Sequence, residues 1–183
     1  IAFDDLRKVK PDFGQMADLL HLNALCKFNA KDFDDSLKLC GEFLQAYAQH
    51  ERSGDVRFLE AENRFFLDQE AKAIDLYGSF LAKHKDHARV NAAKMRIGQS
   101  EFTLKNWAKA LGILEPLRTA KEAGSMFDQL EFLVADSYYH QNKFAKAVPI
   151  YIKFADAKPK STNADTALIK AGLASEKLKK NAD

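Results

Sequence analysis

A short sequence phrase recurs along the chain at a fixed interval, and this period constrains the fold more than any other feature. The phrase reads NWAKALGIL at residues 106–114 and KFAKAVPIY at residues 143–151, and EAKAIDLY at residues 70–77 is a shorter version. We align the copies on one position, called the anchor, which is occupied by Phe33, Glu70, Trp107 and Phe144. Successive anchors are 37 residues apart, and such a period is typical of proteins that stack copies of one small unit.

The residues after each anchor have the spacing of an amphipathic helix. A small residue stands three places after the anchor, and apolar residues stand four, seven and ten places after it, which is one face of a helix. The small residues are Ser36, Ala73, Ala110 and Ala147, and the residues seven places on are Cys40, Tyr77, Leu114 and Tyr151. Each anchor therefore begins a helix, which we call the second helix of its unit.

The residues before each anchor predict a first helix of the same kind. Small residues stand nine places before the anchors, and aromatic residues stand five places before them. The small residues are Ala24, Ala61, Gly98 and Ala135, and the aromatic residues are Phe28, Phe65, Phe102 and Tyr139. Small residues let two helices approach closely, and turn-like residues lie between the two patterns at 29–32, 67–69, 105–106 and 142–143. Each unit is therefore predicted to be a helical hairpin.

One hairpin cannot bury both of its apolar faces, whereas stacked hairpins can. The sequence therefore predicts an all-α fold, namely an α-solenoid of about four helical hairpins with a 37-residue period and a C-terminal capping helix. Glycine (8) and proline (4) are scarce, which argues against a loop-rich or all-β fold.

The expected domain organisation follows from the same frame and from helix boundary signals. Gly124 and Ser125 with Asp128 indicate a helix end followed by a new cap, and Thr162 with Asp165 repeats the signal. We expect an N-terminal extension at residues 1–14 and a repeat domain at residues 15–183. The expected units are about 17–53, 54–90, 91–127 and 128–164, followed by the capping helix at about 163–180.

These features together resemble the tetratricopeptide repeat, a family of helical-hairpin arrays. The resemblance rests on the twelve-residue spacing of the small residues, the aromatic residue before Ala-Lys-Ala, and the terminal Pro159. Consensus positions of the family are filled in the fourth unit by Ala135, Tyr138, Phe144, Ala147, Tyr151 and Pro159, and in the third by Gly98, Trp107 and Ala110. The second unit departs from the pattern where Glu70 replaces the aromatic residue, and the first where Ser36 replaces alanine.

The period also resembles one branch of the family. The usual repeat is about 34 residues, and units longer than this are similar to those of bacterial envelope proteins such as the Tol-Pal-associated cell-division coordinator and the outer-membrane assembly lipoproteins. This resemblance implies a periplasmic or cell-envelope location, with a cytoplasmic location as the alternative. The chain begins at Ile1 rather than Met, and we take it as a fragment or a processed form.

Composition narrows the classes of function. The net charge is +2, so no global field favours nucleic acid or acidic lipid. No apolar run has the length of a membrane span, so direct membrane insertion is not expected. No phosphate-binding loop, nucleophile elbow or two-histidine helix motif occurs. We therefore expect no catalytic residues, no cofactor and no bound metal, and we predict that the chain is not an enzyme.

Two groups of reactive side chains have a structural explanation. His84 and His87 flank a turn with no further ligands nearby in sequence, so we interpret them as a solvated turn rather than a metal site. Cys26 and Cys40 lie too far apart along facing helices for a disulfide, so we predict two buried free thiols. The column of aromatic residues five places before the anchors fits a ligand ladder or an inter-repeat core, and we favour the core.

The resemblance implies where a partner would bind. In this family the first helices line a concave face, so the first-helix positions outside the core are the candidates, among them Asp18, Leu22 and Leu25 in the first unit. The predicted partner-binding residues are Asp55, Leu59, Glu62, Arg96, Gln99, Gln129, Leu133 and Asp136. Polar residues mixed with exposed leucines suit a peptide or helix in a groove, and the absence of an Arg or Lys run there argues against nucleic acid.

The leading hypothesis is a non-catalytic protein–protein interaction scaffold that binds a peptide or helix in its concave groove, in bacterial cell-envelope assembly. Three alternatives stay open: a docking domain of a larger enzyme, a cytosolic adaptor, and a self-assembling repeat module. The partner in the leading hypothesis is a protein or peptide, and the oligomeric state stays undetermined.

Overall fold

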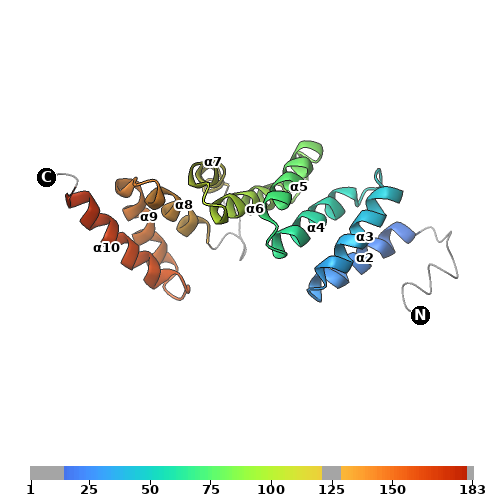
Figure 1. Ribbon diagram of the computed structural model, residues 1–183, viewed down its shortest axis with the longest axis horizontal. Helices are drawn as coiled ribbons and strands as arrows, with labels where there is room; N and C mark the ends of the chain where they lie inside the picture. The colour runs from blue at the N-terminus through green and yellow to red at the C-terminus, as the bar shows by residue number, and fades with distance from the viewer. Residues whose placement is uncertain (1–14, 121–128, 181–183) are drawn as a thin grey trace. The chain divides into compact units, whose positions relative to one another are not determined.

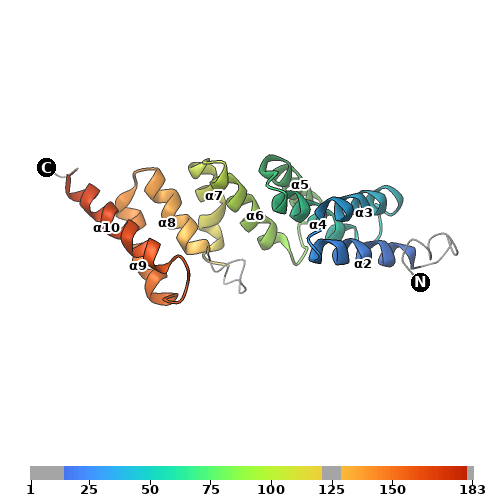
Figure 2. The ribbon, with the colours of Figure 1, turned by 60° about the horizontal axis from the view of Figure 1, so that its bottom comes forward.

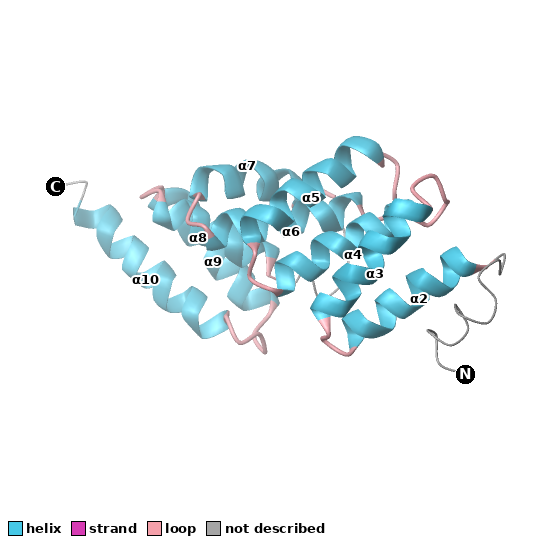
Figure 3. Cartoon of the chain, turned by 45° about the vertical axis from the view of Figure 1, so that its right-hand side comes forward, coloured by secondary structure: helices cyan, strands magenta, loops and turns pink. Residues whose placement is uncertain are grey.

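The computed structural model describes residues 15–120 and 129–180, and within these ranges the chain is helical, with no strand (Figures 1 and 3). The predicted N-terminal extension at residues 1–14 and the helix end at Gly124 lie outside the described residues. The nine helices of the described ranges are α2 (Met16–Asn29), α3 (Phe33–Ala46), α4 (Ser53–Phe66), α5 (Glu70–Lys83), α6 (Val90–Thr103), α7 (Trp107–Leu117), α8 (Leu130–His140), α9 (Phe144–Ala157) and α10 (Ala164–Lys180). The prediction of an all-α fold is confirmed.

Every predicted second helix begins at its anchor. The first residues of α3, α5, α7 and α9 are Phe33, Glu70, Trp107 and Phe144. In α5 this happens without the aromatic residue of the other copies, because the apolar residues after Glu70 still supply the buried face, with Ala73, Tyr77 and Phe80 all buried. The apolar spacing rather than the anchor residue itself therefore determines where the helix forms.

The turn between the two helices has the same geometry in all four hairpins. The residue two places before each anchor has a left-handed backbone, with φ of 62° at Lys31, 54° at Asp68, 62° at Lys105 and 58° at Asn142. Two backbone hydrogen bonds close each turn; in the first, the amide of Asp32 donates to the carbonyl of Lys27 and that of Lys31 to Phe28, both at 2.9 Å. This is the Schellman arrangement that ends many helices, formed here without glycine.

The chain divides into two compact units, Ile1–Ala93 and Lys94–Asp183. From here on we call these halves the first and second units, and we call the 37-residue copies repeats. In the first unit α2 packs on α3, α3 on α4, and α4 on α5. In the second unit α7 packs on α8, α8 on α9, and α9 on α10, and Figure 2 shows α10 alongside α9. The predicted division into an extension and a single repeat domain stays a prediction.

The departure at Ser36 has a structural explanation in the first unit. Ser36 is buried where alanine stands in the later repeats, and its hydroxyl donates to the carbonyl of Ala24 at 2.9 Å. The same hydroxyl accepts a hydrogen bond of 2.9 Å from the side-chain amide of Asn63 in α4. One buried polar side chain therefore joins α2, α3 and α4, which satisfies its hydrogen-bonding capacity inside the core.

Three of the four residues of the aromatic column pack against the anchors of their repeats. Phe28 lies 5.6 Å from Phe33, Phe102 lies 4.9 Å from Trp107, and Tyr139 lies 5.4 Å from Phe144, all measured between ring centroids. Each of these three column residues is half-buried and packs against the core of its unit. Packing is therefore the main role of this column, as the sequence favoured.

The interpretation of the cysteines and histidines needs correction. Both cysteines are free, but only Cys40 is buried, and Cys26 is exposed, because it lies on a side of α2 that faces away from α3. The two histidines do not form a solvated turn. His84 and His87 are half-buried, and both lie on Phe80, with ring centroids 5.5 and 5.1 Å away.

Candidate functional site

The candidate site is a pocket in the first unit between α2 and α4, with a volume of about 230 Å³. Arg89, in the connection between α5 and α6, also contributes to its wall. The lining residues are His21, Leu25, Phe28, Asn29, Asp55, Phe58, Leu59, Glu62 and Arg89. Three of these, Asp55, Leu59 and Glu62, are predicted partner-binding residues.

The repeat itself brings these side chains together. His21, Leu25 and Phe28 are spaced by four and three residues, so they share one face of α2. Phe58 and Glu62 occupy the positions of His21 and Leu25 one period later, and they share the matching face of α4. Consecutive first helices therefore present equivalent positions to the same space.

Apolar side chains form part of the pocket interior, beside the buried carboxylate of Glu62. Phe58 and Leu59 are only 3% and 4% exposed, so they form its base. Leu25 and Phe28 are half-buried on the α2 side, and both pack against the core of the first unit. An apolar side chain of a partner that entered this space would leave water and contact apolar side chains, and this transfer is favourable.

The rim carries charges that are already paired. Asp55 lies 3.5 Å from Nε of Arg89 and 3.5 Å from Nε2 of His87. The guanidinium of Arg89 also lies over the ring of Phe58, 5.0 Å from its centroid, which is a cation–π arrangement. Arg89 remains about half exposed, so its charge can still reach a partner.

His21 contributes a neutral imidazole to the pocket. Burial lowers the pKa of His21 below its ordinary value, and this outweighs the opposing effect of nearby Asp55. At pH 7 the ring therefore offers one hydrogen-bond donor and one acceptor rather than a charge.

Glu62 is buried, and its carboxylate accepts a hydrogen bond from the hydroxyl of Tyr77 in α5. The equivalent residue of the second unit is Asp136, which accepts from the hydroxyl of Tyr151 in the same way. Lys170 of α10 donates to Asp136 at 2.5 Å, and His140 lies 3.7 Å from it. Burial, together with the hydrogen bond to Asp136, raises the pKa of Tyr151, so this hydroxyl stays protonated as a donor.

The other predicted site residues lie in the second unit. Gln129 is exposed and directly precedes α8, whereas Leu133 and Asp136 are buried in α8. Arg96 and Gln99 are half-buried in α6 and are joined by a hydrogen bond of 3.1 Å. The partner-binding role of all eight residues stays a prediction.

The expectation of exposed leucines holds at Leu22, which is 55% exposed, but it is wrong at Leu59 and Leu133, which are 4% and 8% exposed. The reason is that a first helix in the middle of a stack is covered on more than one side. Leu59 belongs to the core of the first unit and Leu133 to that of the second.

Five pocket residues were not predicted as site residues: His21, Phe28, Asn29, Phe58 and Arg89. One signal was available for His21, because the equivalent positions in the other three repeats hold Phe58, Met95 and Phe132. A polar residue in an apolar column indicates a local opening. Arg89 gave no such signal, because it lies outside both helix patterns.

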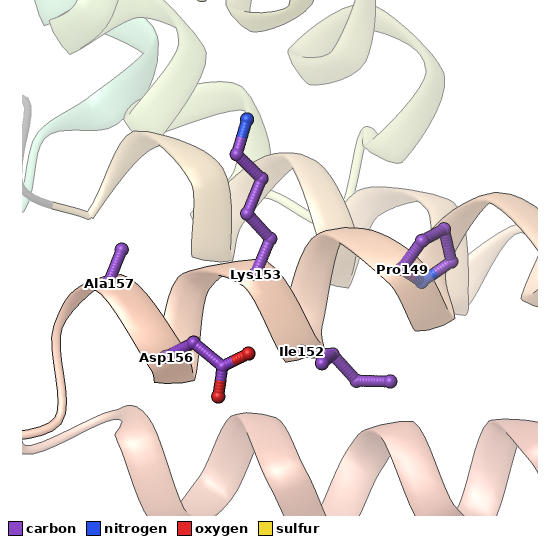
Figure 4. A pocket seen from close by; sticks show the side chains of 5 residues that line it. All are labelled: Pro149, Ile152, Lys153, Asp156 and Ala157. Atoms are coloured by element: carbon purple, nitrogen blue, oxygen red, sulfur yellow. The ribbon is translucent and has the colours of Figure 1, made fainter.

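The second unit has a hollow of its own on α9. An open hollow of about 590 Å³ lies on α9, lined by Pro149, Ile152, Lys153, Asp156 and Ala157, with α10 running beside it (Figure 4). Across the described ranges, no three His, Cys, Asp or Glu side chains are grouped in a way that could hold a metal ion. Among the described helices, none has the length and apolar character required to cross a membrane.

Known proteins resemble this chain in structure. A tetratricopeptide repeat protein from Parabacteroides merdae is similar with a TM-score of 0.72 and 13% identity, over 97% of this chain and 69% of that chain. MamA from Desulfovibrio magneticus RS-1 is similar with a TM-score of 0.63 and 14% identity, over 91% of this chain and 97% of that chain. The TPR-like repeats of a putative kinesin light chain from Podosopora anserina give a TM-score of 0.63 at 12% identity, over 90% and 88%. No protein-family model matches the sequence, and the search of curated proteins gave no match.

Proposed function

Because the chain has the tetratricopeptide-repeat fold, we propose that it is a non-catalytic protein-interaction scaffold that binds a peptide or helix at the pocket between α2 and α4. The observation that carries this proposal is the pocket itself, which has an apolar base and a charged rim and lies between equivalent faces of two first helices.

The size of the pocket supports a peptide rather than a small-molecule ligand. Pockets for drug-sized ligands usually have volumes of about 300–1,000 Å³, whereas this one has about 230 Å³. That space suits one large apolar side chain from a partner whose backbone runs along the rim. The proposed peptide therefore has a Leu, Met or Phe that enters between Phe58 and Leu25, next to an acidic residue that faces Arg89.

The cellular location of the protein is also a proposal. The proposal of a periplasmic or cell-envelope location rests on the resemblance of the long repeat period to that of bacterial envelope proteins. A cytosolic adaptor or a docking domain of a larger enzyme would use the same fold, and capture of partners from fractionated cells distinguishes these alternatives. Self-assembly through repeat faces is tested by light scattering across a concentration series.

The binding site is tested by charge reversal on the rim. Arg89→Glu removes the cation beside Phe58 while leaving the buried residues unchanged, so the chain should remain folded. Peptides selected from a random library on the wild-type chain should bind Arg89→Glu about tenfold more weakly, a loss of about 1.4 kcal/mol.

The matched control is Lys38→Glu, which makes the same charge change at an exposed position of α3 outside the pocket. Circular dichroism checks that both variants are helical. Equal affinity of the selected peptides for Arg89→Glu, for Lys38→Glu and for the wild-type chain would overturn the proposed site.

A further inference from the structure

The last helix, α10, occupies the position of a first helix. It lies one 37-residue period after α8, so Ile169 corresponds to Phe132 and Gly172 corresponds to Ala135. One face of α10 is built from Ala164, Ala167, Ala171 and Ala174, all buried. This alanine face packs on α9, the second helix of the preceding hairpin.

In complete hairpins the other face of the first helix is covered by its own second helix. Phe58 lies 5.6 Å from both Tyr77 and Phe80 of α5, measured between ring centroids. Phe132 makes the same pair of contacts with Tyr151 and Phe154 of α9, at 5.9 and 5.6 Å. In the second and fourth hairpins, the aromatic residue at this position of the first helix therefore packs against the same two positions of the second helix.

The small residue of the first helix marks the same contact. Ala61 and Ala135 are fully buried. At Gly98 in α6 an added Cβ atom would lie 2.3 Å from Cδ2 of Leu114 in α7. A second helix thus approaches closely at this position in each hairpin where the contact is described.

On α10 the equivalent surface is open. Ile169 is 64% exposed, and its neighbours Leu168 and Leu173 are 50% and 46% exposed. An added Cβ atom at Gly172 would meet no atom within 4 Å among the described residues. We call Leu168, Ile169, Gly172 and Leu173 the α10 face. Three large apolar residues exposed together on one helix are a feature of interaction surfaces.

We propose that the α10 face binds an amphipathic helix that has the second-helix pattern of the repeat. The pattern is a small residue with large apolar residues one, four and seven places after it, as at Ala73, Ile74, Tyr77 and Phe80 of α5. This occupant follows from continuity with the hairpin interface, because α10 presents the first-helix half of that interface in register. The site is separate from the pocket of the first unit, so it does not depend on the proposed function.

The probe for this site is a labelled synthetic peptide with the α5 sequence, EAKAIDLYGSFLAK. It should bind the 183-residue chain saturably, and a peptide of the same composition in scrambled order should not. Ile169→Glu places a charge in the centre of the α10 face, and it should weaken binding by about tenfold or more. The residue is exposed, so the variant should fold.

The matched control is Leu104→Glu, which also replaces an exposed aliphatic side chain by a carboxylate, at a leucine that is 44% exposed and directly follows α6, and peptide binding should be unchanged. The proposal is overturned if the α5 peptide binds Ile169→Glu as well as the wild-type chain, or if it does not bind the wild-type chain saturably. Self-association of the chain that Ile169→Glu abolishes would also overturn it, because the occupant would then be a second copy. Arg89→Glu, the variant that tests the pocket between α2 and α4, should bind the α5 peptide like the wild-type chain. The two proposals can therefore fail independently.

Discussion

Two buried carboxylates are matched by two buried tyrosines, and this pairing is the main polar feature of the repeat at the residue scale. Glu62 with Tyr77 and Asp136 with Tyr151 occupy the positions eight residues before and seven residues after an anchor. In the first and third repeats the same positions hold Leu25 with Cys40 and Gln99 with Leu114. A buried carboxylate costs free energy unless it is hydrogen-bonded, so the acid and the tyrosine occur together.

Removal of one partner tests this pairing. Tyr151→Phe deletes the hydroxyl that donates to Asp136 and leaves a buried carboxylate oxygen without that donor. We expect a loss of about 1–3 kcal/mol in the free energy of unfolding, measured by urea denaturation. In a double-mutant cycle with Asp136→Leu, the double variant should lose less than the sum of the two single variants. Additive losses would show that the pair is not coupled.

Two histidines of the first unit should make its stability depend on pH. Burial lowers the pKa of His21 and of His84, so below pH of about 6.5 the unfolded chain binds more protons than the folded chain. The stabilisation is therefore complete above the ordinary histidine pKa and decreases as pH falls through the folded pKa values. Urea denaturation at pH 7.5 and 5.5 should show a smaller decrease for the double variant His21→Gln and His84→Gln. An equal decrease in both proteins would refute this assignment.

At the scale of the element, each hairpin depends on a close approach of two helices and on a turn of fixed geometry. The turn residues Lys31, Asp68, Lys105 and Asn142 all adopt the left-handed conformation, which side chains other than glycine, asparagine and aspartate rarely adopt outside such motifs. At Lys31 and Lys105 the hydrogen bonds of the turn and the packing of the helices therefore stabilise a backbone that local preference alone would not select, whereas Asp68 and Asn142 adopt it more readily.

The glycines of the third hairpin should respond in opposite directions to the same substitution. Gly98→Ala adds a Cβ atom 2.3 Å from Cδ2 and 2.5 Å from Cγ of Leu114, so the Leu114 side chain or the helix that carries it must shift, at a cost of about 1–3 kcal/mol. Gly112→Ala adds the same atom in α7 where, apart from the backbone of α7 itself, no atom of the described residues lies within 4 Å. It should stabilise the chain by about 0.5–1 kcal/mol, because alanine loses less backbone entropy in a helix.

Thermal and urea denaturation of both glycine variants measure this difference, and each serves as the control for the other. If Gly98→Ala were as stable as Gly112→Ala, the close contact between α6 and α7 would not exist in solution.

At the scale of the whole molecule, the two units have separate hydrophobic cores. The core of the first unit extends from Met16 to Leu59 and that of the second from Met95 to Ala171. In repeat proteins stability is approximately a sum of local terms. Tyr151→Phe should therefore increase amide hydrogen exchange in α8, α9 and α10 and leave α2 to α5 unchanged. Hydrogen-exchange mass spectrometry measures this, and an equal increase along the whole chain would show that the units unfold together.

The fold could be predicted from the sequence because its determinants are local. The apolar spacing after Phe33, Glu70, Trp107 and Phe144 depends only on residues within one helix, and each second helix begins where that spacing begins. The same reasoning explained the small residues at which facing helices meet, such as Gly98 against Leu114.

The candidate site was only partly predictable. The burial of a side chain depends on which neighbouring helices cover it, and the sequence does not show which ones do. Leu22 and Leu59 occupy the same position in successive first helices, yet they are 55% and 4% exposed. The tyrosines that satisfy Glu62 and Asp136 were placed in the core without their hydroxyl groups being matched to those acids. Their joint occurrence in the second and fourth repeats was the available signal.

Because only one of the two cysteines is exposed, the native chain can be labelled at a single site and used for a fluorescence measurement of distance. Cys40 is fully buried, and burial raises its pKa to about 12, so its thiol stays protonated and unreactive, whereas Cys26 is exposed. A maleimide dye should therefore attach at a single place in the first unit, one residue from Leu25 of the pocket. The only tryptophan, Trp107, lies in the second unit. Energy transfer from Trp107 to that dye would report the distance between the two units, and its change when a partner binds, without any substitution.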